Sequence, residues 1–349
     1  MERINRIVPP DSAAYFAAKN RWDSIAKPLG SFGRLEEMLQ KIAAVQGTPE
    51  IGISRRCAVV FCADHGIVAE GVTQCGSEVT AICANAIAAG TSNVNAVAAA
   101  VSAETLAVDV GMKTDIDAPH LMNRKVAYGT RNFTHKPAMT EQEVTAAVTV
   151  GMETARLMRD KGVNIIVSGE MGIGNTTAAS AIAAVLLGQP PEAVTGRGAG
   201  LSSEWLARKI AVIRRGITLH RPSPDRPLHL MQTLGGLELA AMTGLFLGGA
   251  YYHIPVVIDG MISAAAAAVA YKMQPLTAEY MLASHCSGEP AASGLLAMMG
   301  FSPVIDAGLR LGEGTGGLLL LPLLDGAYAI YRSAHRFADE NMEGYKELI

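Results

Sequence analysis

The stretch VNIIVSGEMGIGNTT, from Val163 to Thr177, decides the fold of this chain. Its opening run, Val163 to Ser168, is mostly apolar and β-branched, which is typical of a strand that helices cover on both faces. Glycines follow, and then an alanine-rich pattern predicts a helix from near Ala178. This order of strand, glycine loop and helix predicts one unit of a parallel α/β sheet.

Other parts of the chain repeat the pattern. Three more apolar runs that end in glycine or polar residues predict strands at Ala58–Ala63, Thr105–Val110 and Ile254–Ile258. Apolar periodicity predicts helices at Ser77–Ala99, Glu141–Lys161, Leu237–Leu247 and Ile262–Tyr271. The predicted fold class is therefore α/β, with a Rossmann-like parallel sheet flanked by helices. Thr140 and Glu143 have the spacing of a capping box at the start of the second helix.

The two ends of the chain differ from its middle. Residues 11–46 predict two helices that Lys27–Ser31 separates, and the charge-rich segment Asp325–Ile349 has no strand pattern. We expect residues 1–50 and 325–349 to form a small helical domain. Residues 51–324 are expected to form the large α/β catalytic domain.

Composition limits the classes of function. The 349 residues are 50% hydrophobic with a mean hydropathy of +0.24, enough for a large buried core, and the net charge is −3. Such a balance gives no basic surface for nucleic acid or for an anionic membrane. Leu239–Ile258 carries no charge, but its glycines, His253 and Pro255 favour a buried helix followed by a strand over a membrane span.

Cysteine usage points to a reducing compartment. The 5 cysteines form no CxxC pair, so neither a disulfide framework nor a metal site is expected. The first residues contain charges and Pro9-Pro10 rather than an apolar signal segment. We expect a cytoplasmic protein.

The glycine loop after the first quoted run is a candidate phosphate cradle. Gly172 and Gly174 allow close approach of a ligand, and Asn175 and Thr176 precede the helix, whose N–H groups favour an anion. The loop has neither the lysine of a GxxxxGK[ST] motif nor GxGxxG spacing, so ATP hydrolysis and a dinucleotide cofactor are not supported. A tight turn without a ligand remains the alternative.

Two further segments offer groups to the same anion. Beyond Gly196–Gly200, a helix carries Arg208 and Lys209, either of which could neutralise a phosphate or simply be solvated. Ser287 and Gly288 belong to the segment Ser284–Pro290, which follows another apolar run. This segment has neither a GxSxG elbow nor a cysteine-protease signature, so covalent catalysis is not predicted.

The segment RLGEGTGG, from Arg310 to Gly317, supplies the candidate catalytic group. Glu313 lies among glycines ahead of an apolar run, where burial would raise the pKa of its carboxyl toward that of a general base. The alternative is a solvated glutamate at a helix start. Asp64 and His65 are adjacent on an extended segment and point to opposite faces, so a structural or ligand-positioning role is favoured over a shared metal.

Taken together, ordered blocks over nearly the whole chain resemble the nicotinate-nucleotide:5,6-dimethylbenzimidazole phosphoribosyltransferase family. The blocks are Lys27–Glu36, Ala63–Gly66, Glu70–Val72, Val108–Gly111, Pro137–Thr140, Gly169–Thr177, Gly196–Gly200, Pro255–Gly260, Ser284–Pro290 and Arg310–Gly317.

The resemblance implies a reaction in which nicotinate mononucleotide and an aromatic acceptor give an α-ribotide and nicotinate, in the service of cobamide biosynthesis. It implies a homodimer, no cofactor and no metal. It also implies that Glu313 is the catalytic base, with Leu311 and Gly312 beside the acceptor. The residues implied for the nucleotide and its phosphate are Glu170, Gly172, Gly174, Asn175, Thr176, Lys209, Ser287 and Gly288, and Asp259 is a candidate accessory acid.

The acceptor pocket departs from the family pattern. Cys75 and Cys83 align with positions that carry polar serine and glutamine in well-known relatives, and thiols are weak hydrogen-bonding groups. An acceptor with one polar atom, such as phenol or p-cresol, is therefore an alternative to a benzimidazole. The branch of the family that uses phenols works as a heterodimer of two related chains. A nucleotide-binding regulatory protein is the competing class, and it would not need Glu313.

Overall fold

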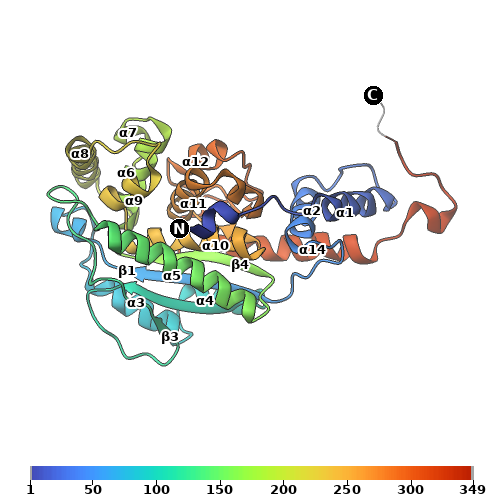
Figure 1. Cartoon of the computed structure of the whole chain (residues 1–349), viewed down its shortest axis with the longest axis horizontal. Coiled ribbons are helices and arrows are strands. Elements are labelled where there is room, and N and C mark those ends of the chain that lie inside the picture. The colour runs from blue at the N-terminus through green and yellow to red at the C-terminus, as the bar shows by residue number, and fades with distance from the viewer. Residues whose placement is uncertain (1, 347–349) are drawn as a thin grey trace.

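The computed structural model describes residues 2–346 and confirms the α/β prediction. Six parallel strands form one sheet in the order β3-β2-β1-β4-β5-β6 (Figure 1). The strands are β1 Arg56–Ala63, β2 Glu104–Gly111, β3 Leu121–Asn123, β4 Ile165–Met171, β5 Val256–Ile258 and β6 Met281–Ala283. Because β1 pairs with both β2 and β4, the strand order reverses next to β1, which is where such sheets bind ligands.

Helices cover both faces of this sheet, and the longer ones agree with the sequence periodicity. The α-helices are α1 Ser12–Ser24, α2 Arg34–Gln46, α3 Glu78–Ala88, α4 Asn93–Ala100, α5 Glu141–Asp160, α6 Asn175–Leu187, α7 Pro191–Val194, α8 Ser203–His220, α9 Pro227–Leu234, α10 Leu237–Tyr252, α11 Met261–Met273, α12 Ala292–Met298, α13 Thr315–Leu318 and α14 Leu320–Ser333. Short 3₁₀ helices are η1 Glu2–Arg6, η2 Gly66–Glu70, η3 Pro275–Tyr280 and η4 Phe337–Glu340.

Alternate residues of β1 face two different core layers. Val59 and Phe61 belong to the cluster that includes α10, whereas Val60 and Cys62 belong to the cluster that includes α3. All four side chains are 0% exposed. Burial on both faces explains why the predicted strands are apolar throughout instead of alternating.

Some predicted limits were wrong. The single helix predicted over Ser77–Ala99 is two helices, because Gly90 adopts a left-handed φ of 79° and Ser92 with Asn95 forms a capping box that starts α4. The helix after the cradle begins at Asn175 rather than near Ala178. The strands β3 and β6 were not predicted, since three residues carry too little periodicity to identify a strand.

Other local predictions were confirmed. Thr140 Oγ1 accepts from the Glu143 backbone N–H at 3.1 Å, and Glu143 Oε2 accepts from the Thr140 N–H at 2.6 Å, so the capping box exists. The uncharged stretch Leu239–Ile258 divides between α10 and β5. Within residues 2–346, no helix has the combined length and apolar character that crossing a bilayer would require.

Helices from the two ends of the chain lie together beside the sheet (Figure 1). Trp22 of α1 contacts Tyr331 of α14 with ring centroids 5.5 Å apart, and Ile25 forms a β-bridge with Arg336. Because α14 begins at Leu320, this helix crosses the boundary expected at residue 325. The division into two domains therefore stays a prediction whose C-terminal limit falls inside a helix.

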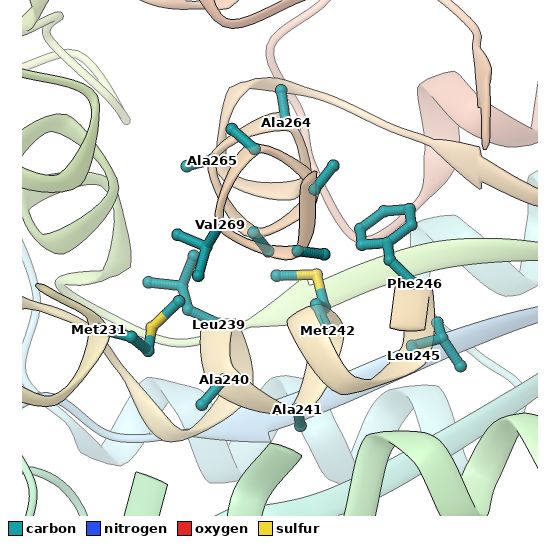
Figure 2. Packing of buried hydrophobic residues seen from close by; sticks show 14 of the residues in the cluster. Met231, Leu239, Ala240, Ala241, Met242, Leu245, Phe246, Ala264, Ala265 and Val269 are labelled. Carbon is teal, nitrogen blue, oxygen red and sulfur yellow. The ribbon is translucent and has the colours of Figure 1, made fainter. Parts of the chain in front are cut away.

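The helix α10 is packed between two neighbours. Figure 2 shows Leu239 and Met242 pointing toward α11, while Ala241 and Leu245 point the opposite way. On that opposite side, α5 and α10 meet through glycines: a Cβ built on Gly151 would lie 1.8 Å from Ala241 O, and one built on Gly244 would lie 1.9 Å from Val148 O.

Gly151→Ala is expected to lower the free energy of unfolding by about 3 kcal/mol, because the new methyl group can be accommodated only if two helix backbones separate. Urea unfolding followed by circular dichroism measures this loss. The matched control is Gly326→Ala in α14, where a Cβ meets nothing within 4 Å. That change should stabilise the protein by about 0.5–1 kcal/mol. Equal stabilities for the two variants would contradict the described α5–α10 packing.

Candidate active site

A cavity of about 240 Å³ opens where β4, β5 and β6 end. Because parallel strands present their carboxyl ends at one edge, residues far apart in the sequence meet there. Nine of the predicted site residues line this cavity: Glu170, Gly172, Asn175, Thr176, Asp259, Ser287, Leu311, Gly312 and Glu313. The other five, Cys75, Cys83, Gly174, Lys209 and Gly288, are not in the lining and are placed individually below.

Glu313 is buried at the cavity, which contradicts the solvated alternative. It is 8% exposed and adopts a left-handed φ of 61°, between Gly312 at 90° and Gly314 at 88°. A left-handed conformation in a non-glycine residue costs about 1–2 kcal/mol and occurs where the surroundings enforce it. Here the Glu313 carbonyl oxygen packs against Gly169 of β4, and a Cβ built on Gly169 would lie 2.6 Å from that oxygen. This close contact holds the backbone of Glu313 in place.

The carboxyl group of Glu313 has the electrostatics of a base. Burial raises its pKa above 4.5 and Asp259 raises it further, while the Val94 backbone N–H of α4 favours the charged form. One carboxyl oxygen, Oε2, is buried without a partner among the described residues. The group is thus a carboxylate with raised proton affinity and an unused acceptor atom.

Asp259 holds the loop that carries Glu313. Its Oδ2 accepts from the Gly314 N–H at 3.2 Å, and its Oδ1 accepts from the Gly317 N–H at 2.7 Å. Both oxygens are therefore occupied by the backbone at the start of α13. This geometry favours a role in positioning Glu313 over direct proton transfer by Asp259.

Glu170, at the end of β4, is held by Asn175. The Asn175 side-chain amide donates to Glu170 Oε2, so this asparagine orients a carboxyl group instead of standing free for a ligand. Burial, and then the charges of Asp259 and Glu238, raise the pKa of Glu170 well above its usual value. Burial among other carboxylates therefore disfavours the charged form of Glu170.

The predicted phosphate cradle is a tight turn between β4 and α6. Gly174 has φ 100°, and a Cβ on Gly172 would lie 2.6 Å from the Ala63 carbonyl oxygen, so both positions require glycine. Thr176 in the first turn of α6 lines the cavity. The same two glycines are needed for the turn itself, whether or not a ligand is bound.

Lys209 supports this turn from behind. Its Nζ donates to Thr176 Oγ1 at 2.8 Å and to the Gly196 carbonyl at 3.3 Å, and the residue is 1% exposed. Burial lowers its pKa to about 8, against an opposing effect of Glu289. The neighbouring Arg208 is exposed and forms an ion pair with Glu204 on its own helix at 3.5 Å. Of the two predicted cations, the buried lysine is therefore the one that reaches the cradle.

The segment after β6 completes the opposite wall. Ser287 faces the cavity, whereas the Gly288 N–H donates to the Leu309 carbonyl at 2.9 Å and fixes the backbone. Glu289 also lines the cavity, and its Oε1 accepts from the Gly198 N–H at 3.1 Å. Sequence reasoning placed Glu289 in the correct segment but gave it no role, because its partner is 91 residues away.

The two cysteines differ in position. Cys83 lies on α3, close to Glu313. Burial is the main cause that raises the pKa of its thiol, and the Glu313 carboxylate raises that pKa further. Cys75 is exposed and lies close to Cys83. The helix that carries Cys83 is attached to the cradle, because Thr80 Oγ1 accepts from the Ile173 N–H at 3.1 Å.

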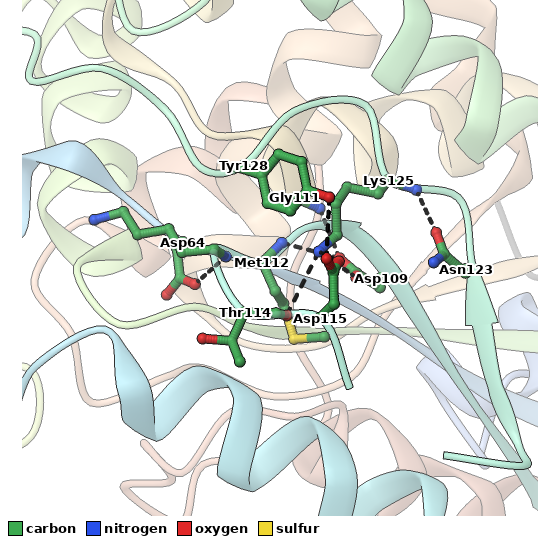
Figure 3. A network of polar contacts seen from close by, with 10 residues as sticks. Asp64, Asp109, Gly111, Met112, Thr114, Asp115, Asn123, Lys125 and Tyr128 are labelled. Carbon is green, nitrogen blue, oxygen red and sulfur yellow. Dashed lines mark hydrogen bonds and ion pairs between the residues drawn. The ribbon is translucent and has the colours of Figure 1, made fainter. Parts of the chain in front are cut away.

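Asp64 and His65 diverge as expected for neighbours on an extended segment. Asp64 turns toward the loop after β2, where it accepts from the Lys113 backbone N–H at 2.8 Å, beside the network of Asp109 and Lys125 (Figure 3). His65 instead contacts Glu238 at 2.6 Å. Among the described side chains, no group of three or more His, Cys, Asp or Glu is arranged to hold a metal ion.

The His65–Glu238 pair lies directly behind the cradle. Both side chains are almost fully buried, and a Cβ on Gly172 would come within 3.4 Å of His65 Nε2 and of Glu238 Oε1. Sequence reasoning missed this pair, since 173 residues separate its members.

Glu238→Ala is expected to lower the free energy of unfolding by about 1–3 kcal/mol, because it leaves the buried His65 ring without its hydrogen-bond partner. Glu238→Gln keeps an acceptor atom and should lose less. Thermal and urea unfolding measure both changes, with exposed Glu153→Ala as the control, which should stay within about 0.5 kcal/mol of wild type. A loss in the Ala variant no greater than in the control would refute a stabilising role for the pair.

Comparison with known proteins identifies the family. A family model described as phosphoribosyltransferase matches residues 7–341. The nicotinate-nucleotide–dimethylbenzimidazole phosphoribosyltransferase of Ruminiclostridium cellulolyticum is 40% identical over 347 residues, which cover 99% of each chain. The Desulforudis audaxviator protein of the same name is 41% identical over 98% of each chain. A crystal structure of the Thermus thermophilus enzyme of that name superposes with a TM-score of 0.89 at 38% identity, covering 96% of this chain and 100% of that one. This chain therefore belongs to the nicotinate-nucleotide–dimethylbenzimidazole phosphoribosyltransferase family.

Proposed function

We propose that this protein transfers the phosphoribosyl group of nicotinate mononucleotide to a benzimidazole-type base, giving an α-ribotide and nicotinate for cobamide synthesis. The names of its full-length relatives support the reaction and both substrates. Within the site, the assignment depends on Glu313. Its buried carboxylate has one oxygen without a partner among the described residues, and it lines the same cavity as the cradle.

The reaction needs one base and no acid. The bond from ribose C1′ to the positively charged pyridine nitrogen breaks, and nicotinate leaves with that nitrogen neutral. A new bond forms between C1′ and a ring nitrogen of the acceptor, which must lose its N–H proton. Glu313 would accept this proton and orient the acceptor, and its raised pKa suits the role.

The remaining residues have supporting roles in this proposal. Thr176, Ser287 and the backbone of the cradle would hold the phosphate, with Lys209 behind them. Positive charge that develops on the ribose would be stabilised by the nearby Glu313 carboxylate. Leu311, Gly312 and Cys83 would form the acceptor side.

The names of the relatives given above support a benzimidazole acceptor, and none of them supports the phenol alternative. The test is nicotinate release from nicotinate mononucleotide by the purified protein with dimethylbenzimidazole, adenine, phenol or p-cresol, each supplied separately. Release that depends on dimethylbenzimidazole is expected. Activity with phenols alone would overturn the acceptor assignment, and no activity with any of the four would overturn the reaction.

We also infer that the protein is a homodimer rather than a heterodimer. Leu319 and Leu323, one turn apart at the start of α14, are 40% and 39% exposed. Exposed leucines grouped in this way are typical of an association surface. Sedimentation of the purified chain tests this: a monomer would refute the inference. The free cysteines support a reducing compartment such as the cytoplasm.

A further inference from the structure

One wall of the cavity carries a histidine that the proposed reaction does not use. His285 follows β6, is 3% exposed and lines the cavity. Its ring lies against the backbone of α13, because a Cβ built on Gly316 would be 2.1 Å from Cε1 and 2.4 Å from Nδ1. Glycine at 316 therefore makes room for the imidazole, and the contact fixes the orientation of the ring.

The hydrogen bonds around His285 determine its tautomer. Ser284 Oγ lies 2.6 Å from the Ile258 carbonyl oxygen and 2.9 Å from His285 Nδ1. A carbonyl oxygen cannot donate, so the single hydroxyl hydrogen of Ser284 is directed to Ile258. The hydroxyl must then accept from an Nδ1–H, and in a neutral ring this leaves Nε2 with a lone pair.

The ring is neutral near pH 7. Burial lowers the pKa of His285, and this effect exceeds the opposing influence of Asp259. No described residue forms a hydrogen bond with Nε2. The atom is also not completely enclosed by protein, so a ligand in the cavity can reach it. The structure thus presents an oriented acceptor atom to the cavity.

The position of this atom fits the middle of a nucleotide. A Cβ built on Gly260 would lie 3.8 Å from His285 Nε2 and also 3.8 Å from Ser287 Oγ, so the two side chains face the same point. A Cβ built on Gly316 would lie 2.8 Å from Nε2. Ser287 belongs to the proposed phosphate wall, and Gly316 is in α13, three residues after Glu313. Between a bound phosphate and the reacting C1′ lies the ribose, whose hydroxyls are donors.

We propose that His285 Nε2 accepts a hydrogen bond from a ribose hydroxyl of the nucleotide, with Ser284 holding the required tautomer. This assignment rests on the proposed function and deepens it by giving the ribose a specific contact. It makes His285 a substrate-positioning residue and Ser284 a residue that acts through it.

The test compares nicotinate mononucleotide with its 2′-deoxy and 3′-deoxy analogues. Wild-type protein should lose about 10- to 100-fold in kcat/KM with one of the two analogues, because an acceptor atom is left unpaired. His285→Asn should show the same loss with the natural nucleotide and no further loss with that analogue. Asparagine places an amide where Nδ1 lies, so the Ser284 contact survives while the Nε2 acceptor is removed.

Two more variants separate contact from packing. His285→Gln places an amide oxygen near the former Nε2 and should recover part of the loss, and Ser284→Ala should have an intermediate effect because the tautomer is released. His120→Asn, at an exposed position, is the control and should behave as wild type. Calorimetric binding of the three nucleotides repeats the comparison without turnover.

The outcomes distinguish the two proposals. If wild-type protein releases no nicotinate from the natural substrates, the reaction is wrong, and the binding measurements still report on His285. If His285→Asn discriminates against both analogues as strongly as wild type does, the contact assigned to Nε2 is wrong whatever the reaction.

Discussion

Glu313→Gln is expected to lower kcat for nicotinate release by about 10²- to 10⁴-fold, the usual contribution of a general base. The amide keeps the size and one acceptor oxygen of the carboxylate but cannot take the acceptor's proton. The KM for nicotinate mononucleotide should change little, since the phosphate contacts are unaffected. Steady-state kinetics with saturating dimethylbenzimidazole measure both constants. Exposed Asp306→Asn, in the segment leading to the Glu313 loop, is the matched control and should keep wild-type kcat.

The pH dependence should identify the same group. Activity requires ionised Glu313, so kcat should fall as the pH drops through a pKa that lies above the usual 4.5. In the glutamine variant this acidic limb should vanish, leaving a low, flat rate. A variant that keeps both the wild-type rate and the acidic limb would remove Glu313 from the mechanism and favour the regulatory alternative.

The same pKa shift has a consequence for stability. Because the folded-state pKa of Glu313 is raised, its protonated form stabilises the fold below the unfolded-state pKa, and this stabilisation is lost as the pH rises through the folded value. The uncharged glutamine avoids that loss. The variant should therefore be at least as stable as wild type at pH 7, so a loss of activity cannot be attributed to unfolding.

Local pattern predicted a strand over Val163–Ser168 followed by a glycine turn; the structure has both, with the strand at Ile165–Met171. It also predicted a buried carboxylate at Glu313, because its glycine neighbours allow close backbone packing directly ahead of the apolar run Leu318–Leu324. These features depend on neighbours in sequence, which periodicity and turn chemistry describe directly.

Contacts between distant segments were beyond the reach of such reasoning. Nothing near His65 indicates that it pairs with Glu238, and nothing near Glu289 indicates that it accepts from the Gly198 N–H. The tautomer of His285 depends on the carbonyl of Ile258, at the end of a different strand. Register and strand order decide these pairs, and both are properties of the folded sheet.

Lys209→Met is expected to weaken binding of nicotinate mononucleotide by about 10- to 100-fold, because the hydrogen bonds of a buried cation to a charged group are worth about 1.5–3 kcal/mol. Methionine keeps an unbranched apolar stem in the same space. Isothermal calorimetry measures the affinity, and Arg208→Met on the exposed face of α8 is the matched control. Equal losses in the two variants would show that only general electrostatic attraction is involved.

Without a bound ligand, Lys209→Met should be more stable than the wild-type protein. Burial lowers the pKa of Lys209 from 10.5 to about 8, so the folded protein binds this proton less well than the unfolded chain does. The cost of burying the lysine charge lowers the free energy of unfolding. This cost is absent above pH 10.5 and fully present below about pH 8, where the pKa shift corresponds to about 3 kcal/mol. Loss of the bonds to Thr176 and Gly196 offsets about half of it. Urea unfolding at pH 7 should therefore show Lys209→Met more stable by about 1–2 kcal/mol.

Proton uptake links these two effects. A phosphate dianion at Thr176 would favour the charged form of Lys209, so wild-type protein should take up protons on binding nicotinate mononucleotide near pH 8. Calorimetry in buffers of different ionisation enthalpy measures this uptake, which should disappear in Lys209→Met and persist in Arg208→Met. Uptake that is unchanged in the methionine variant would mean that the lysine does not sense the phosphate. Its burial would then serve only the turn before α6.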